Sequence, residues 1–458
     1  MSGIDRASPW VALVRVFAGF LLLYEAVAGG WWKLGTLSTG PNPEWLGPEA
    51  GVAIAEVSER AIDEGTYAWY ALVLETVVLP YATTWSYVAT AAQIAVGLAL
   101  VAGLWSRPAA LFGLLYFFPV FHFGTIRTSP LFAVPILFVL VANAGYHYGL
   151  DGRIARKRGS LARLSDRGAS HERLAPPRRS YPLLAALAAL CSTYYLLSIS
   201  GMEEGRLALV GLELAVLFGL VAGGFVLAYR GADPVGIGGD LLRVFVGYRL
   251  LQEVFVRTEP GLNALPGWAS PMEQAAVFEG IAAVHVAPVA AFVEAAVLPV
   301  IGLWVLVFAV VQTACGVALL VGYRTRLFGT VAVGYLTLLV ALGFVRLAPL
   351  VLVSAIAAAT LGGRYASLDA LSERDLDPPA LPEWVAVPAG ALAVVLGVTG
   401  IALGVEPGGY GETTGAISLV MLAMVLGATA VAAHASGSEP TLADRPRGAS
   451  RSIDTPNR

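Results

Sequence analysis

Residues 13–25 read LVRVFAGFLLLYE, and residues 241–253 read LLRVFVGYRLLQE. Eight of the thirteen positions are identical, including an arginine near one end (Arg15 and Arg243) and a glutamate at the other (Glu25 and Glu253). Both stretches are apolar enough to belong to membrane-crossing helices, where an ionised side chain is costly unless it finds a partner. The chain therefore repeats one apolar segment, and each copy holds two charges that need an explanation.

The amino-acid composition is typical of a membrane protein. Of its 458 residues, 57% are hydrophobic and 13% are charged, about half of the roughly 25% charged residues found in soluble domains. The two cysteines stand alone and indicate neither a disulfide framework nor a dithiol pair. Lysine occurs only at Lys33 and Lys157 among 29 basic residues, a bias typical of GC-rich coding. The sequence predicts an all-α polytopic membrane protein.

Apolar runs of about 20 residues, the length that crosses a bilayer, recur from end to end. We expect about 12 transmembrane helices, near residues 10–32, 85–104, 108–124, 129–148, 181–200, 207–229, 241–256, 300–321, 327–345, 348–362, 384–404 and 415–434. Residues 67–82 are apolar but short and contain Pro80. They form either an interfacial or re-entrant helix, or the first part of one long helix kinked at the proline.

The repeat extends well beyond the opening stretch. With a constant offset of 219, residues 71–146 align without a gap with residues 290–365. Two further spans follow each four-helix copy, and an even number of spans per unit gives both copies the same orientation. The sequence predicts two parallel four-helix bundles, each followed by a helix pair, in the order 4+2+4+2. The shared positions include Glu75/Glu294, Pro80/Pro299, Trp85/Trp304, Gln93/Gln312, Gly97/Gly316, Gly103/Gly322, Arg107/Arg326, Tyr116/Tyr335, Arg127/Arg346 and Tyr146/Tyr365.

Domain boundaries and orientation follow from this order. We expect a first module over 1–150, a basic cytoplasmic linker over 151–180, a helix pair over 181–230, a second module over 231–370, a second pair over 371–434 and a disordered cytoplasmic tail over 435–458. With both termini cytoplasmic, the inner segments hold 20 Lys and Arg residues and the outer segments six, as the positive-inside rule requires. The linker alone holds nine basic residues; we interpret it as a cytoplasmic anchor in the cell membrane and expect no nucleic-acid partner.

The charged residues that both copies share are the most informative feature for a functional site. We expect Arg15 to snorkel towards the inner surface, and Glu25 and Glu75 to lie at a similar depth. There the two acids share a proton, bind a cation or meet Arg127. Two interpretations stay open: a buried network that fixes helix packing, or a site for a substrate, a quinone or protons. For such a site the candidate catalytic residues are Glu25, Glu75, Arg127, Glu253, Glu294 and Arg346; the candidate substrate- or quinone-binding residues are Arg15, Gln93, Tyr116, His122, Arg243, Arg249, Gln312 and Tyr335.

Arg249 distinguishes the two copies, because the first copy has Leu21 at this position. Arg249 lies four residues before Glu253 and therefore on the same face of a helix. We expect the two side chains to form an ion pair that lowers the cost of burying them. The copies are then not equivalent, and one of them is mainly structural.

One helical face of the second span carries Gln93, Gly97, Leu100 and Arg107. Glycine permits close backbone approach and glutamine forms hydrogen bonds across helices, so this face predicts a helix–helix contact. His122 lies near the outer interface and has either a structural or a redox or proton role. The chain has no haem-attachment motif, iron–sulfur cysteine set or P-loop. We expect no metal and no tightly bound cofactor.

Residues 97–118, GLALVAGLWSRPAALFGLLYFF, and residues 316–339, GVALLVGYRTRLFGTVAVGYLTLL, resemble the DoxX/DoxD family of small four-helix membrane proteins. The resemblance covers about 13–150 and 241–370. Many members carry a glutamate in the second helix, where this chain has Gln93 and Gln312. The family core G-L-x-L-x-x-G-L-x-[ST]-R is carried by Gly97, Leu98, Leu100, Gly103, Leu104, Ser106 and Arg107.

The family includes the DoxD subunit of archaeal thiosulfate:quinone oxidoreductase. The resemblance therefore implies a membrane subunit of a quinone-linked oxidoreductase, with thiosulfate or a related sulfur compound as the electron donor. Quinone would be a substrate dissolved in the membrane lipid, and a second oxidoreductase subunit would be the partner. Two alternatives remain. Parallel duplication and intramembrane carboxylates are also typical of a transporter or proton-coupled carrier, and the chain can serve as a non-catalytic scaffold subunit.

Overall fold

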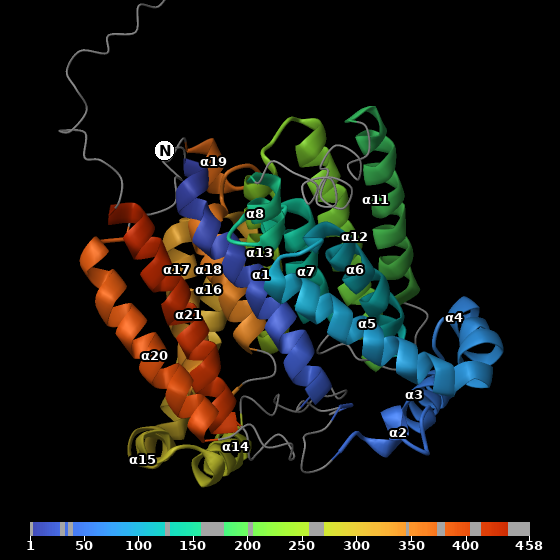
Figure 1. Cartoon of the computed structure of the whole chain (residues 1–458), viewed down its shortest axis with the longest axis horizontal. Helices are drawn as coiled ribbons and strands as arrows, with labels where there is room; N and C mark the ends of the chain where they lie inside the picture. Colours follow the sequence, from blue (N-terminus) through green and yellow to red (C-terminus); the bar gives the residue numbers. More distant parts are fainter. Residues whose placement is uncertain are drawn as a thin grey trace, which may run out of the picture.

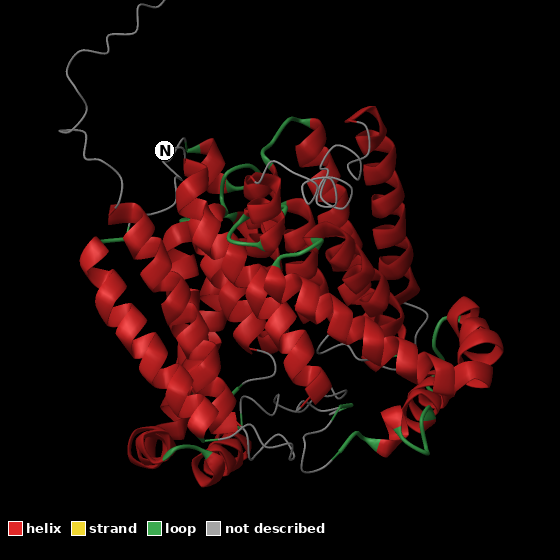
Figure 2. Ribbon diagram, in the orientation of Figure 1, coloured by secondary structure: helices red, strands yellow, loops and turns green. Residues whose placement is uncertain are grey.

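The computed structural model describes residues 3–27, 33–34, 40–123, 129–156, 178–199, 205–255, 270–344, 348–372, 381–403 and 414–437 (Figure 1). Within these ranges the regular elements are helices, and no strand occurs (Figure 2). By length and composition, seven of the described helices can cross a membrane, and three shorter apolar helices accompany them. The protein is therefore all-helical over the described residues, with several candidate membrane-spanning helices.

A helix lies at each of the twelve ranges that the sequence marks as apolar. The first module consists of α1 (Gly3–Val27), α5 (Ala82–Ala102), α6 (Ser106–His122) and α7 (Ser129–Val141). The second consists of α13 (Pro234–Phe255), α16 (Ile301–Val321), α17 (Thr325–Ala341) and α18 (Ala348–Leu361). The helix pairs are α11 (Tyr181–Ser198) with α12 (Gly205–Tyr229), and α20 (Ala386–Ala402) with α21 (Thr414–Gly437).

The two modules fold alike and pack crosswise on each other. Helices α5 and α16 begin and end at positions one repeat offset apart, as do α6 and α17. Helix α1 packs against α18, and its counterpart α13 packs against α7. The helix pairs follow the same pattern, because α12 contacts α13 and α6 while α21 contacts α1 and α17. The pairs flank the bundle on opposite sides (Figure 1), and each pair packs against helices of both modules.

Residues 67–82 continue into α5 as one bent helical path. Helix α4 (Ala68–Val73) leads through a π-helical turn at Leu74–Val78 and a 3₁₀ turn at Leu79–Tyr81 into α5. Tyr81, with φ −125° and ψ 27°, leaves the helical region at the bend, and α4 turns away from the axis of α5 (Figure 1). This geometry agrees with a helix kinked at Pro80, where the proline cannot donate a main-chain hydrogen bond.

A tryptophan fixes this bend in both copies. The indole Nε1 of Trp85 donates to the carbonyl oxygen of Val77 at 2.9 Å, and that of Trp304 donates to Ala296 at the same distance. Helix α15 (Ala287–Phe292) and the turns at Val293–Val297 and Leu298–Val300 repeat the path of the first copy. The shared tryptophans therefore satisfy carbonyl groups that the bend releases from the helix.

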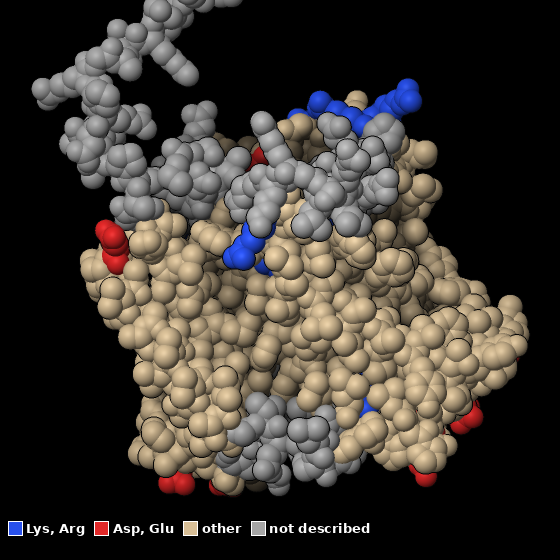
Figure 3. Space-filling model, in the orientation of Figure 1, with Lys and Arg blue, Asp and Glu red and all other residues tan. Residues whose placement is uncertain are grey.

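Charged side chains avoid the middle of the surface shown in Figure 3. On the face shown in Figure 3, lysine and arginine gather at the upper end, most acidic side chains lie at the lower end, and the broad belt between them is almost free of charge. The start of α1 and the end of α21 both lie at the upper end (Figure 1). Such a belt is what a lipid-facing surface requires, because lipid cannot solvate a charge.

Glycines bring the first two helices of each module into close contact. A Cβ atom on Gly19 would lie 2.7 Å from the carbonyl oxygen of Gly97, and one on Gly247 would lie 2.9 Å from that of Gly316. Only glycine allows this approach. Gln93, Gly97 and Leu100 are buried in α5, and Gln93 donates to the carbonyl oxygen of Leu22 in α1 at 2.9 Å. The predicted helix–helix contact is therefore confirmed for these three residues.

Two buried arginines bond to the carboxyl-terminal ends of these helices. Arg15 is 1% exposed; its Nη1 donates to the carbonyl oxygens of Leu100 and of Val101, the latter at 2.9 Å. Arg243 is fully buried and bonds in the same way to Leu319 and Leu320. The last carbonyl groups of a helix have no partner within it and attract a positive charge. Arg15 therefore points towards the end of the bundle that the sequence analysis expects to lie inside, and buried carbonyl groups rather than water surround its charge.

One aspartate in each module accepts hydrogen bonds from the start of that module's third helix. The Asp151 carboxylate accepts hydrogen bonds from the main-chain N–H groups of Trp105 and Ser106, at 2.8 and 3.0 Å, and Asp369 occupies the same place at the start of α17. A third aspartate, Asp240, pairs with Arg243 at 2.9 Å. The first copy has Ala12 at the position of Asp240, and the Nε of Arg15 has no hydrogen-bond partner among the described residues.

Because of this difference, replacing the buried arginine with methionine should lower the stability of the protein by different amounts in the two modules. Arg15→Met should lower the free energy of unfolding by about 1–3 kcal/mol, because buried carbonyl groups lose their donor. Arg243→Met should lower it by about 3–5 kcal/mol, because it also leaves the buried Asp240 carboxylate without its cation. The measurement is unfolding in detergent micelles, with Arg60→Met on the exposed surface of α3 (Val52–Asp63) as the control. Equal effects of the two core substitutions would contradict this account.

Candidate functional site

Lys33 and Leu34, which follow α1 in the sequence, lie against the first module. The main-chain N–H of Leu34 donates to the carbonyl oxygen of Ala26 at 2.9 Å, and Asn42 donates to that of Lys33 at 3.2 Å. Asn42 also caps the short helix α2 (Pro43–Leu46), which positions Trp45. These bonds direct the Lys33 side chain towards the middle of α5 rather than into water.

Lys33 lies at the centre of a small polar cluster. The side chain is 2% exposed. Its ammonium nitrogen lies 2.8 Å from Oε1 of Gln93 and 3.3 Å from the hydroxyl oxygen of Tyr116. The same nitrogen lies 3.8 Å from the ring centre of Trp45, a distance at which a cation is attracted to the ring face. We define Lys33, Gln93, Tyr116 and Trp45 as the lysine cluster.

The environment of Lys33 makes it titrate near neutral pH. Burial lowers the pKa of Lys33 to about 7, because the charged form loses its hydration, and the negative charge of Glu25 opposes this shift. Glu25 is half-buried at the end of α1. A group with this pKa can both release and recover a proton under physiological conditions, and such groups concentrate at functional sites.

The second module keeps only part of the lysine cluster. Gln312 and Tyr335 correspond to Gln93 and Tyr116, and the Gln312 amide donates to the Tyr335 hydroxyl. The sequence has no lysine beyond Lys157, so the second module cannot form an equivalent ammonium site. The two copies have the same scaffold, but only the first has a titratable amine beside the glutamine and tyrosine.

A second cluster lies between the first helix pair and the second module. Arg249 of α13 is 4% exposed and forms ion pairs with Glu213 of α12 and with Glu253, both at 3.0 Å. The predicted pairing of Arg249 with Glu253 is therefore confirmed. Gln252 accepts from Arg249 and donates to Glu213. Tyr248 contributes a buried hydroxyl. We define Glu213, Tyr248, Arg249, Gln252 and Glu253 as the charge cluster.

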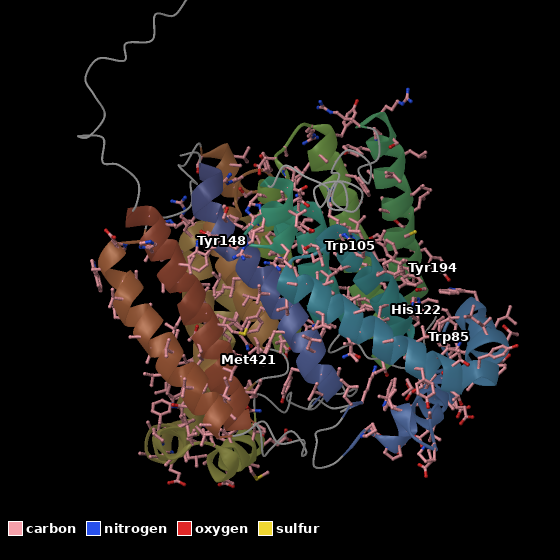
Figure 4. The ribbon with its side chains drawn as sticks, in the orientation of Figure 1. Trp85, Trp105, His122, Tyr148, Tyr194 and Met421 are labelled. Carbon is pink, nitrogen blue, oxygen red and sulfur yellow. The ribbon has the colours of Figure 1, made fainter. Side chains whose placement is uncertain are left out.

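Helices α21 and α1 have apolar side chains at the positions that Glu213 and Arg249 occupy in α12 and α13. Helices α12 and α21 can be aligned, because Leu214 and Gly219 in α12 have the same spacing as Leu422 and Gly427 in α21. In this alignment Met421 takes the position of Glu213. Met421 and Leu21, the counterpart of Arg249, are both buried. Figure 4 shows Met421 on the side of α21 that faces the bundle. The repeated architecture therefore does not require an ion pair here.

His122 belongs to an aromatic cluster rather than to the lysine cluster. It is completely buried, with Nε2 3.1 Å from the hydroxyl oxygen of Tyr195 and Nδ1 2.8 Å from the carbonyl oxygen of Phe118. The rings of Tyr67 and Tyr70 pack against the imidazole, and Tyr194 lies nearby (Figure 4). These contacts join α4 and α6 to α11 and explain His122 as a packing residue.

The remaining predicted site residues divide into three groups. Glu75 and Glu294 lie in the π-helical turns with exposed side chains. The expected burial of Glu75 beside Glu25 is not observed, because the bend at Pro80 directs this turn outwards. Arg127 and Arg346 lie outside the described residues. Arg15 and Arg243 occupy the structural positions described above, at the opposite end of α5 and α16 from the two bends.

Sequence reasoning missed two central residues, Lys33 and Glu213. Lys33 stands in a loop, where a charge needs no explanation, and Glu213 lies outside the repeat that directed attention to shared positions. A signal existed for Lys33, because a chain that uses arginine almost everywhere retains a lysine there. Unlike arginine, lysine can lose its proton inside a protein.

Among the described residues, no group of three or more His, Cys, Asp or Glu side chains is placed to hold a metal ion. Comparisons of the chain with family models, with curated proteins and with solved structures find no match. The functional argument therefore depends on the two polar clusters themselves.

The shifted titration of Lys33 can be measured directly, because the chain contains only two lysines. In protein labelled with [ε-¹³C]lysine, two Cε resonances are expected. One of them should titrate near pH 7, where burial places the pKa of Lys33. Lys33→Arg should remove the first resonance and Lys157→Arg the second. Two resonances that both titrate above pH 10 would contradict the buried position of Lys33.

Proposed function

We propose that the chain is a membrane subunit of a quinone-linked oxidoreductase and that the lysine cluster binds the quinone head group. The observation that carries this proposal is the buried ammonium group of Lys33 between Gln93 and Tyr116. A quinone ring needs hydrogen-bond donors at its carbonyl oxygens and an apolar path for its tail. The Lys33 ammonium and the Tyr116 hydroxyl are donors of this kind, and apolar helices surround them.

Proton supply is the second part of the argument. Reduction of a quinone to a quinol consumes two electrons and two protons. Lys33, with a pKa of about 7, can donate a proton to a carbonyl oxygen and recover one afterwards, which is the behaviour expected of a general acid at neutral pH. Glu25 is half-buried beside it and is suited to return the proton to Lys33.

Reduction of the quinone also needs a source of two electrons. In this proposal a second subunit or a sulfur compound such as thiosulfate delivers them at the lower end of the bundle, where Lys33 and α2 lie. The twelve helices then cross the cell membrane with both termini on the cytoplasmic side. The concentration of basic side chains at the upper end of the molecule supports this orientation (Figure 3).

One observation favours a second candidate function, a proton-coupled carrier. The charge cluster places a buried carboxylate and a partly exposed one beside a buried guanidinium between α12 and α13. The apolar residues at the corresponding positions of α1 and α21 indicate that packing alone does not demand these charges. Intramembrane ionisable groups are common in ion and proton pathways. Uptake of solute by proteoliposomes without any quinone would favour this function over the first.

The oxidoreductase proposal predicts that Lys33 controls quinone reduction. The complex purified from native membranes, supplied with thiosulfate and a short-chain quinone analogue, should reduce the quinone. Lys33→Met should lower the rate by roughly 100-fold or more, the usual contribution of a general acid. Lys33→Arg should be similarly slow, because arginine keeps its proton.

The matched control is Lys157→Arg, which changes the other lysine of the chain and should leave the rate unchanged. Tyr116→Phe should raise the KM for the quinone analogue more than it lowers kcat, because it removes a hydrogen bond to the bound ring. Unchanged quinone reduction in Lys33→Met would exclude the lysine cluster as the quinone site.

A further inference from the structure

The oxygen contacts of Lys33 in the lysine cluster can form with or without a charge on its amine. Nζ lies 2.8 Å from Oε1 of Gln93 and 3.3 Å from the hydroxyl oxygen of Tyr116. A neutral amine keeps two N–H bonds and gains a lone pair. It can therefore still donate to the Gln93 oxygen and accept from the Tyr116 hydroxyl. These two contacts hold the side chain in place but do not decide whether it carries a proton.

The contact with Trp45 is of a different kind, because it favours the charged form. Nζ lies over the indole ring, 3.8 Å from the ring centre, and is 5.9 Å from the ring centre of Tyr116. The face of an aromatic ring attracts a cation, most strongly when the ring is tryptophan and the site is closed to water. Lys33 is 2% exposed and Trp45 is 7% exposed, so water screens this attraction little.

Three elements hold the Trp45 ring in this position. The main-chain N–H of Trp45 donates to the carbonyl oxygen of Asn42 at 3.1 Å, at the start of α2. The hydroxyl of Ser86 in α5 donates to the carbonyl oxygen of Trp45 at 2.7 Å. Trp45 also packs against Ala53 and Ile54 of α3. The fold therefore keeps the ring face against the amine.

We propose that Trp45 is a positioning residue whose ring face keeps the Lys33 amine protonated until a bound quinone takes the proton. The effect on the amine concerns the chain by itself, whereas the transfer to quinone rests on the proposed function. In that step an N–H bond of Lys33 breaks and an O–H bond forms on a quinone carbonyl oxygen. The electrons come from the donor of the proposed function, a sulfur compound such as thiosulfate. The neutral amine then loses its attraction to the ring.

Other titratable groups also surround Lys33. The negative charge of Glu25, at the end of α1, acts on it, and Glu44 lies in the first turn of α2. Helix α6 contributes Tyr116, and α5 contributes the neutral Gln93. The charged residues of α3 are exposed. Since nearby carboxylates also favour the protonated amine, a test must change the ring and leave these groups in place.

The titration of [ε-¹³C]lysine in the purified chain makes this separation. Trp45→Phe should lower the pKa of Lys33, and Trp45→Leu should lower it further, by about one unit in all. Fluorotryptophan in place of tryptophan should also lower this pKa, because fluorine weakens the attraction of the ring for a cation and barely changes its volume.

The matched control is Trp45→Phe with the same fluorinated amino acid. There the pKa of Lys33 should not respond to fluorination, which assigns the effect in the wild-type chain to Trp45 rather than to another tryptophan. A pKa of Lys33 that rises in Trp45→Leu, or that fluorination of the wild-type chain leaves unchanged, would overturn the proposal.

The pH dependence of quinone reduction by the complex from native membranes gives a second readout. Trp45→Leu should slow the reaction at pH 7 and recover much of the wild-type rate about one pH unit lower, where the amine regains its proton. An equal loss at every pH would overturn the role of Trp45 in proton transfer and show a packing effect. If the wild-type complex reduces no quinone analogue but fluorination still lowers the pKa of Lys33, the proposed function fails and the effect of Trp45 on the amine stands.

Discussion

A helix bundle in lipid must find partners for its polar groups inside the protein, because the surroundings supply none. Arg15 and Arg243 meet this constraint at the same place in each module: both guanidinium groups bond to carbonyl oxygens at the end of the next helix. The interaction fixes the first helix of each module against the second, and the glycine contacts set their separation. The aspartates at the starts of α6 and α17 hold the following helix. The remaining packing, including the crosswise contacts of α1 with α18 and of α13 with α7, is built on these two pairs.

Because the chain contains two copies of one module, residues at corresponding positions can be compared directly. Gln93 and Gln312 both hold a tyrosine across the module, so this pair belongs to the shared scaffold. Gln93 also uses its amide to donate to Leu22 in α1, which a carboxylate could not do. The titratable group of the first module is instead Lys33, supplied by a loop that the second copy does not share. In the same way Glu213 and Arg249 replace an apolar pair, Met421 and Leu21. If one copy folds without a given polar residue, the fold does not require that residue. Residues of this kind are therefore the best candidates for a function.

The sequence predicted the helices and the repeat well, because both depend on apolar periodicity and on residues compared at a fixed offset. It also predicted the Arg249–Glu253 pair, which is set by spacing along one helix. It did not predict the partners of Arg15, because these are main-chain carbonyl groups from a helix 85 residues away. The exposure of Glu75 depends on the direction of a bend. Lys33 was missed because the path of a loop decides its burial, and Glu213 because its partners come from a different helix. Each of these depends on tertiary contacts that no local pattern contains.

The most direct test of the account is an experimental structure of the protein in lipid nanodiscs, determined with a quinone analogue. The account predicts density for the head group against Lys33 and Tyr116 in the first module and no corresponding density between Gln312 and Tyr335 in the second. It also predicts that Lys33 is enclosed by Trp45 in the protein without the analogue. A quinone bound equally in both modules, or a Lys33 side chain extended into water, would contradict the central claim that the first module alone has become the reactive copy.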